Sequence, residues 1–75
     1  MTTEQDGQLE NWFTYHPPKP GQPGRYQHVR ETGLALAEVI TRECPPSWER
    51  DQALLRVREA VMWSNASIAC NEADS

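Results

Sequence analysis

The sequence has little of what usually builds an independent domain. Hydrophobic residues make up only 37% of its 75 residues, which is low for a globular chain. A chain this short buries roughly 60% of its unfolded surface, so a core of its own is marginal. The shortage lies at the ends, because residues 1–11 and 71–75 are almost wholly polar. We therefore expect one domain at most, whose middle associates with copies of itself.

Membrane-spanning and secretion segments are also missing. No apolar stretch approaches the ~18–20 residues that cross a bilayer, and the N-terminus has neither the basic start nor the apolar core of a signal peptide. Cysteine is scarce, and Cys44 and Cys70 are expected to close two antiparallel helices at opposite ends. That separates them by about 39 Å at a rise of ~1.5 Å per residue, too far for a disulfide. We expect free thiols, a cytoplasmic protein and no membrane partner.

Motifs for catalysis or metal binding are absent. The two histidines, His16 and His28, lie on different segments without a Cys-x-x-Cys or His-Glu-x-x-His pattern. Gly21 and Gly24 lie among prolines and suit turns, not a loop that binds phosphate before a helix. We therefore expect no enzyme, no metal and no cofactor.

The net charge of −4 is unevenly distributed. Five acids lie in the terminal segments, which leaves six acids against seven bases between residues 15 and 70. No basic cluster resembles a face that binds duplex nucleic acid, so we expect no duplex partner. A small anionic ligand held by a few arginines remains open.

Residues 1–24 are predicted to form a polar, proline-rich N-terminal arm, short or extended. Residues 1–11 are expected to be frayed, and residues 12–16 contain three aromatics. Prolines at four positions within residues 17–24 disfavour a helix there. Either this rigid stretch holds the aromatics in one place, or the aromatics merely cover the open end of a hairpin.

The first helix is predicted over about residues 25–43. Apolar positions recur there every three or four residues, as a helical stripe requires: Tyr26, Val29, Gly33, Leu36, Ala37, Ile40 and Cys44. Glycine in a helix interior costs about 1 kcal/mol relative to alanine. Gly33 therefore indicates close approach of another helix or of a ligand, unless it is simply tolerated.

The Cys-Pro-Pro-Ser sequence at residues 44–47 ends that helix, because proline disfavours helical backbone before it. Ser47 can cap a second helix whose first turn contains Glu49 and Asp51. The second helix is predicted over residues 48–71, followed by a tail at residues 72–75. So short a connection implies antiparallel neighbours.

The second helix is apolar over much of its circumference. One stripe contains Leu54, Val57, Val61, Asn65 and Ile68, and a second contains Leu55, Met62, Ala66 and Ala69. A single partner helix cannot cover so broad a surface. We therefore predict an all-α fold, a two-helix antiparallel hairpin that assembles into a homo-oligomeric helical bundle.

Residues suited to binding nucleotides are present in both predicted helices and in the arm. Flat apolar surfaces come from Tyr15, Tyr26 and the three tryptophans, and planar donors come from Arg25, Arg30, Arg56 and Arg58. Stacking combined with arginine is a recurrent way to hold unpaired nucleotides. In the alternative interpretation Trp48 and Trp63 are core or interface residues and the arginines are solvated.

Several motifs occur in a recognisable order. They are Phe-Thr-Tyr-His-Pro-Pro at residues 13–18, Arg-Tyr at 25–26, Cys-Pro at 44–45, Glu-Arg at 49–50, Ala-Val-Met-Trp-Ser-Asn-Ala at 60–66 and Ile-Ala at 68–69. Together, over about residues 12–72, they resemble the phage helical-hairpin domain shared by anti-CBASS and anti-Thoeris sponge proteins. In that family a short segment precedes two long antiparallel helices, and the subunits assemble, often as hexamers. They sequester cyclic di- or trinucleotides, or cyclic ADP-ribose isomers, without chemical turnover.

The resemblance implies particular ligand contacts. Tyr15 would stack on a base, and Arg30, fifteen positions later, would meet phosphate where the family has lysine. Thr32 stands where the family has a hydroxyl near its trinucleotide pocket. Cys70 stands where the family commonly has arginine, which disfavours trinucleotides more than dinucleotides. The other candidate ligand-binding residues are Arg25, Tyr26 and Asn65.

The function implied is a phage sponge that captures cyclic oligonucleotide second messengers in the cytoplasm of the host cell. The alternative is a protein-interaction module that uses the apolar face of the second helix to bind a host or phage protein. The size of the particle in solution discriminates between them. A closed hexamer favours the sponge, and a monomer with an exposed stripe favours the module.

Overall fold

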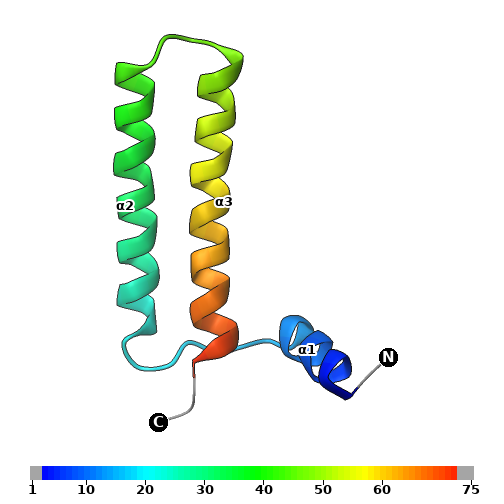
Figure 1. Cartoon of the computed structure of the whole chain (residues 1–75). Coiled ribbons are helices and arrows are strands. Elements are labelled where there is room, and N and C mark those ends of the chain that lie inside the picture. The colour runs from blue at the N-terminus through cyan, green and yellow to red at the C-terminus, as the bar shows by residue number, and fades with distance from the viewer. Residues whose placement is uncertain (1–2, 73–75) are drawn as a thin grey trace.

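The computed structural model describes residues 3–72, which form three helices: α1 (Thr3–Phe13), α2 (Gln22–Glu43) and α3 (Trp48–Asn71). Within that range the structure has no strand. Figure 1 shows α2 and α3 as an antiparallel pair, with α1 at the open end of the hairpin on the side of α3. The all-α class and the antiparallel hairpin are confirmed, and the fold has three helices where the sequence predicted two.

The turn between α2 and α3 lies where the Cys-Pro-Pro-Ser sequence predicted it. Cys44 is extended (φ −109°, ψ 133°) because a proline follows it. Ser47 caps α3, and its Oγ accepts a 3.1 Å hydrogen bond from the Arg50 amide. The Arg50 side chain donates to the carbonyls of Thr41 and Cys44 at 3.4 and 3.3 Å. It thereby pairs two of the carbonyls that the end of α2 leaves open.

Replacing Ser47 with alanine will lower the free energy of unfolding by about 1 kcal/mol, because the Arg50 amide loses its acceptor. Chemical denaturation at a fixed protein concentration measures the change. Ser67→Ala, in the interior of the same helix, is the matched control. It should be neutral or slightly stabilising, and an equal loss in both variants would exclude the capping role.

The start of α2 differs from the predicted start at residue 25. The helix begins at Gln22, after Gly21 adopts a left-handed conformation at φ 85° that costs glycine little. Pro23 lies in the first turn, where a missing amide forfeits no intrahelical hydrogen bond and the fixed φ suits the helix. The last proline of the proline-rich stretch therefore belongs to the first turn of α2.

The N-terminal arm differs most from its sequence prediction, which was a frayed lead-in over residues 1–11. The chain is helical from Thr3, and residues 1–2 lie outside the described residues. Acidic residues in the first turn of α1 complement the helix dipole. Asn11 Nδ2 donates to the Cys70 carbonyl at 2.7 Å. This contact joins residues 59 positions apart, so no local pattern could predict it.

The seam between α2 and α3 is narrow. Gly33 lies where the helices approach closely, because a Cβ added there would overlap Val61 Cγ2 on α3. The close approach predicted at Gly33 is therefore confirmed, with a helix as the neighbour. Among the described residues no hydrophobic side chain is buried, so the seam alone does not make a core.

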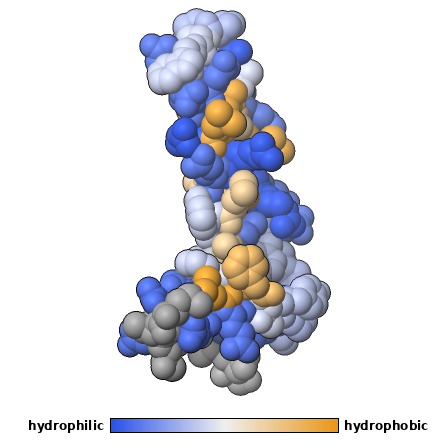
Figure 2. Space-filling view, turned by 90° about the vertical axis from the view of Figure 1, so that its right-hand side faces the viewer, coloured by the Kyte–Doolittle hydropathy of each residue, from blue (hydrophilic) through white to orange (hydrophobic). Residues whose placement is uncertain are grey.

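The surface of the chain is correspondingly large. Its 6123 Å² exceeds the roughly 4,700 Å² of a compact monomer of this mass. Figure 2 shows hydrophobic side chains in separate patches among hydrophilic ones on one face. The exposed large hydrophobic residues are Trp12, Phe13, Tyr15, Leu34, Leu36, Val39, Trp48, Leu55, Met62 and Trp63. The excess of about 1,400 Å² is larger than the ~800 Å² that one partner buries in a specific interface of standard size.

Both cysteines are free thiols, as predicted. Cys44 is exposed at the turn, and Cys70 is half-buried at the opposite end of the hairpin. None of the helices in the described part of the chain combines the length and the hydropathy needed to cross a membrane.

Candidate ligand-binding grooves

Two grooves run between α2 and α3, on opposite faces of the hairpin. They share Gly33, Val57 and Val61 at the seam. Gly33 lies on the side of α2 that faces α3. At 100° per residue around the helix, Arg30 lies to one side of Gly33 and Thr32 to the other. We name the two depressions the Arg30 groove and the Thr32 groove.

The Arg30 groove has a volume of about 370 Å³. It is lined by Arg30, Gly33, Leu34, Ala37, Leu54, Val57, Arg58, Val61 and Met62. Its walls are apolar, and each helix contributes one arginine. No acidic residue is among these lining residues.

Arg30 and Arg58 differ from the other arginines in having no partner in the part of the chain that the structure describes. Arg25 pairs with Glu72, Arg42 with Glu43 and Arg56 with Glu59, while Arg50 binds the turn carbonyls. Arg30 and Arg58 make no hydrogen bond or ion pair with any described residue. Two exposed guanidinium groups without a partner among the described residues, on one apolar groove, favour an oxyanion such as phosphate, whose oxygens accept from the planar pair of N–H donors.

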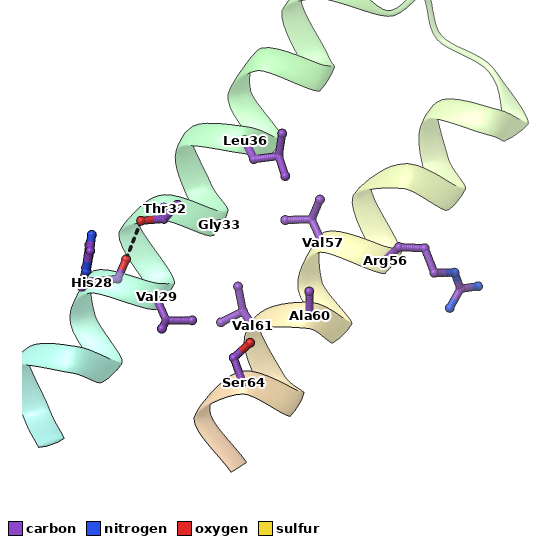
Figure 3. Close-up of a pocket in the computed structure, with 10 residues that line it drawn as sticks. All are labelled: His28, Val29, Thr32, Gly33, Leu36, Arg56, Val57, Ala60, Val61 and Ser64. Carbon is purple, nitrogen blue, oxygen red and sulfur yellow. Dashed lines mark hydrogen bonds between the residues drawn. The ribbon is translucent and has the colours of Figure 1, made fainter. Parts of the chain in front are cut away.

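The Thr32 groove is larger, about 450 Å³, but two of its polar side chains, Thr32 and Arg56, already have partners on their own helices. Thr32 Oγ1 donates to the His28 carbonyl at 2.8 Å within α2. Figure 3 shows valines from both helices between α2 and α3, while the Arg56 side chain points away from α2. Arg56 is held by Glu59 and Gln52 on its own helix. This groove therefore offers mainly apolar contacts.

Side chains from three segments bind the C-terminal end of α3. Asn11 donates to the Cys70 carbonyl at 2.7 Å, Lys19 Nζ to the Glu72 carbonyl at 3.1 Å and Gln22 Nε2 to the Ile68 carbonyl at 3.4 Å. They pair carbonyls that a helix end leaves open. The Glu72 carboxylate binds Arg25 and Gln22. We call these residues the clasp: Asn11, Lys19, Gln22, Arg25 and Glu72.

The clasp was not predicted from the sequence, although one signal was available. The last turn of α3 has no basic residue, and its C-cap, Glu72, is neither glycine nor left-handed. A helix end of that kind needs donors from elsewhere in the chain. Gln22, only 3% exposed, is the most enclosed of those donors.

Hydrogen bonding at the clasp lowers the pKa of the Glu72 carboxyl from its ordinary value of 4.5. The Arg25 guanidinium is the largest cause, followed by the Gln22 amide, and burial opposes both. A carboxyl with a lowered pKa in the folded state stabilises the fold when it is ionised. The stability that the Glu72 carboxylate contributes is complete at a pH above the ordinary pKa of the unfolded chain. It is lost as the pH falls through the lowered pKa of the folded state.

Glu72→Gln will therefore lower the Tm of the protein at neutral pH, and the difference from wild type will shrink as the pH falls below 4.5. At acid pH the wild-type carboxyl is itself neutral, so both proteins lack the charge. Thermal unfolding of both proteins across this pH range measures the convergence. A difference that is constant with pH would show that the ionised carboxylate adds no stability.

The structure distributes the six predicted ligand-binding residues over several places. Arg30 and Thr32 line grooves on opposite faces. Arg25 is engaged with Glu72, and the hydroxyl of Tyr26 lies 3.4 Å from Gln22 Oε1. The remaining two, Tyr15 and Asn65, line neither groove.

Tyr15 and Asn65 contrast in their surroundings. Tyr15, on the linker between α1 and α2, is 80% exposed. Asn65 is half-buried, and its buried Oδ1 has no donor among the described residues. A buried acceptor of that kind is normally paired. Within one chain Tyr15 does not line the groove that contains Arg30, and the contacts of the two residues with one ligand stay a prediction.

The tryptophans lie on the surface of the single chain. Trp48 is 70% exposed and Trp63 72%. Trp12 and Trp63 line a further depression of about 440 Å³ between α1 and α3. None of the three tryptophans is a core residue of the subunit. The interpretations that remain for them are an interface between copies or a surface on which a base stacks.

The fold and grooves define a class of small helical-hairpin proteins with an open, arginine-bearing groove between the two long helices. Residues 5–69 match the family model described as the Acb2/Tad1 hairpin domain. The match spans most of the chain, which therefore belongs to the family of anti-CBASS and anti-Thoeris sponge proteins. It includes nearly all of α1, so this helix is part of the domain. No curated protein and no solved structure matches the chain.

Proposed function

We propose that this protein is an anti-defence sponge that sequesters cyclic di- or trinucleotide immune signals, or cyclic ADP-ribose isomers, without degrading them. The observation that carries the proposal is the pair of unpaired arginines, Arg30 and Arg58, on one apolar groove. Family membership supports the sponge role and cyclic nucleotides as ligands. The protein acts in the cytoplasm of the infected host cell.

The chemistry of the Arg30 groove suits a cyclic dinucleotide best. Such a ligand carries two phosphodiesters, and the groove offers one guanidinium from each helix. Apolar side chains such as Leu34 and Met62 provide surface for the bases or sugars. Cys70 replaces the arginine that the family commonly has near the end of α3, so trinucleotides bind less well. Arg30 binds phosphate, and the Thr32 groove supplies a weaker second site.

Assembly completes the site. An open groove on a single hairpin leaves a ligand exposed to solvent, whereas sequestration requires enclosure. The excess surface and the exposed hydrophobic side chains supply the contacts for a homo-oligomer, with a hexamer favoured by the family resemblance. In this assembly Tyr15 from a neighbouring copy stacks on a base held at Arg30. The Oδ1 of Asn65 accepts a hydrogen bond from the ligand or from another copy.

Isothermal titration tests the proposal. The panel is cyclic di-AMP, cyclic di-GMP, cyclic GMP–AMP, a cyclic triadenylate and a cyclic ADP-ribose isomer, each against a linear dinucleotide as control. At least one cyclic compound should bind at micromolar concentration or below. Failure of every cyclic compound well above that range would exclude the sponge.

A second candidate function follows from the exposed hydrophobic residues of α3, which include Leu55, Met62 and Trp63. They would suit a module that recruits a host or phage protein. Light scattering separates the two functions. A closed oligomer buries these residues among copies and supports the sponge, whereas a stable monomer leaves them available and supports the module.

A further inference from the structure

The linker between α1 and α2 is anchored on both sides of Tyr15. Four residues earlier, Asn11 donates to the Cys70 carbonyl at 2.7 Å. Next to Tyr15, His16 Nε2 lies 2.7 Å from the Asn11 carbonyl, and because a carbonyl only accepts, Nε2 is the donor. Four residues later, Lys19 Nζ donates to the Glu72 carbonyl. The backbone that carries Tyr15 is therefore attached to the end of α3 from two directions.

Between these anchors the chain has little freedom. Prolines at positions 17, 18 and 20 fix φ, and the Lys19 amide donates to Gln22 Oε1 at 2.9 Å. Gln22, nearly fully buried, also binds Glu72 Oε1 at 2.7 Å. The start of α2, the linker and the end of α3 thus share one hydrogen-bond network.

The Tyr15 side chain itself is left open. With 80% of its surface exposed, the ring is placed by the backbone on either side of it. An exposed aromatic on an ordered backbone is the arrangement that reduces the entropy cost of binding, because its position is fixed before the ligand arrives.

We propose that the clasp positions Tyr15 for ligand, so that Asn11 and Glu72 are positioning residues for a site they do not touch. This inference rests on the proposed function, in which Tyr15 stacks on a nucleobase. Neither residue lines the Arg30 groove or the Thr32 groove. Loss of the Asn11 side chain removes one anchor of the linker directly. Loss of the Glu72 carboxylate releases Gln22, whose Oε1 accepts from the Lys19 amide, and so loosens the other side of the linker. Both changes leave the α2–α3 seam at Gly33 in place.

The test uses Asn11→Ala and Glu72→Ala, two variants that release the clasp from different elements. Asn71→Ala is the matched control, because Asn71 adjoins Glu72 but donates only to the Ser67 carbonyl within α3. The first measurement needs no ligand. The heteronuclear NOE of the Tyr15 amide should match that of the helices in wild type and Asn71→Ala, and should fall in both clasp variants. An unchanged value in the clasp variants would overturn the inference.

The second measurement is affinity for the five cyclic compounds of the titration panel: cyclic di-AMP, cyclic di-GMP, cyclic GMP–AMP, the cyclic triadenylate and the cyclic ADP-ribose isomer. Each clasp variant should bind the preferred compound about ten- to a hundredfold more weakly. In a Tyr15→Ala background the same substitutions should cause no further loss, since a positioning role acts only through Tyr15. Equal losses in both backgrounds would indicate a merely structural role and overturn the inference. If the wild-type protein binds none of the compounds, the proposed function itself fails. That result differs from the two outcomes that support or overturn the positioning role.

Discussion

Replacing Arg30 and Arg58 together with alanine will weaken binding of the preferred cyclic nucleotide by roughly 10²- to 10⁴-fold. A hydrogen bond to a charged group contributes about 1.5–3 kcal/mol, and the groove loses both of its guanidinium donors. Because neither arginine has a partner among the described residues, their removal breaks no ion pair of the fold. Isothermal titration of the double variant and of each single variant measures the loss.

Arg42→Ala is the control for the change in charge. Arg42 is exposed, pairs with the adjacent Glu43 at 3.7 Å and lies in neither groove, so its loss should leave affinity within about twofold of wild type. Arg30→Lys should retain part of the affinity, since lysine keeps the charge but not the planar pair of donors. Normal binding by the double variant would place the ligand outside the Arg30 groove.

The second large effect is expected at the helix seam. Gly33→Val will lower the free energy of unfolding by about 2–3 kcal/mol, in the upper part of the range for overpacked sites. Even the Cβ would overlap Val61 Cγ2, and a β-branched valine in a helix has little freedom to rotate away. The helices must separate, which also distorts both grooves. Urea denaturation at matched protein concentration measures the loss of stability.

Gly24→Val is the matched control for that substitution. Gly24 lies in the first turn of the same helix, and nothing surrounds the position of an added Cβ there. The two substitutions are chemically identical, so the difference between them isolates the contact with α3. If both variants lose the same stability, the helices do not depend on close approach at Gly33.

The parts of the fold set by neighbouring residues could be predicted from the sequence. The turn at residues 44–47 follows from two prolines and a capping serine, and α3 occupies its predicted range. Gly33 marked a close contact because a helix interior rarely contains glycine without a reason. The start of α2 was harder, because Pro23 in a first turn looks the same in sequence as proline in an extended linker.

The parts set by distant residues could not be predicted. Helix α1 is held against α3 by the hydrogen bond from Asn11 to the Cys70 carbonyl, and these residues are 59 positions apart. The fold brings Arg25 to Glu72, 47 positions away, and its predicted contact with ligand stays a prediction. The grouping of Arg30 with Arg58 likewise depends on the register of α2 against α3, which periodicity on each helix leaves undetermined.

The most direct measurement of the sponge function is the identity of the small molecule released by the protein. Purified protein is incubated with a mixture of the five cyclic compounds of the titration panel, separated from free ligand and denatured by heat. The supernatant is then analysed by mass spectrometry. We predict release of an intact cyclic dinucleotide, which the Arg30→Ala, Arg58→Ala variant does not retain. Release of a linearised nucleotide, or of no nucleotide at all, would contradict sequestration without turnover.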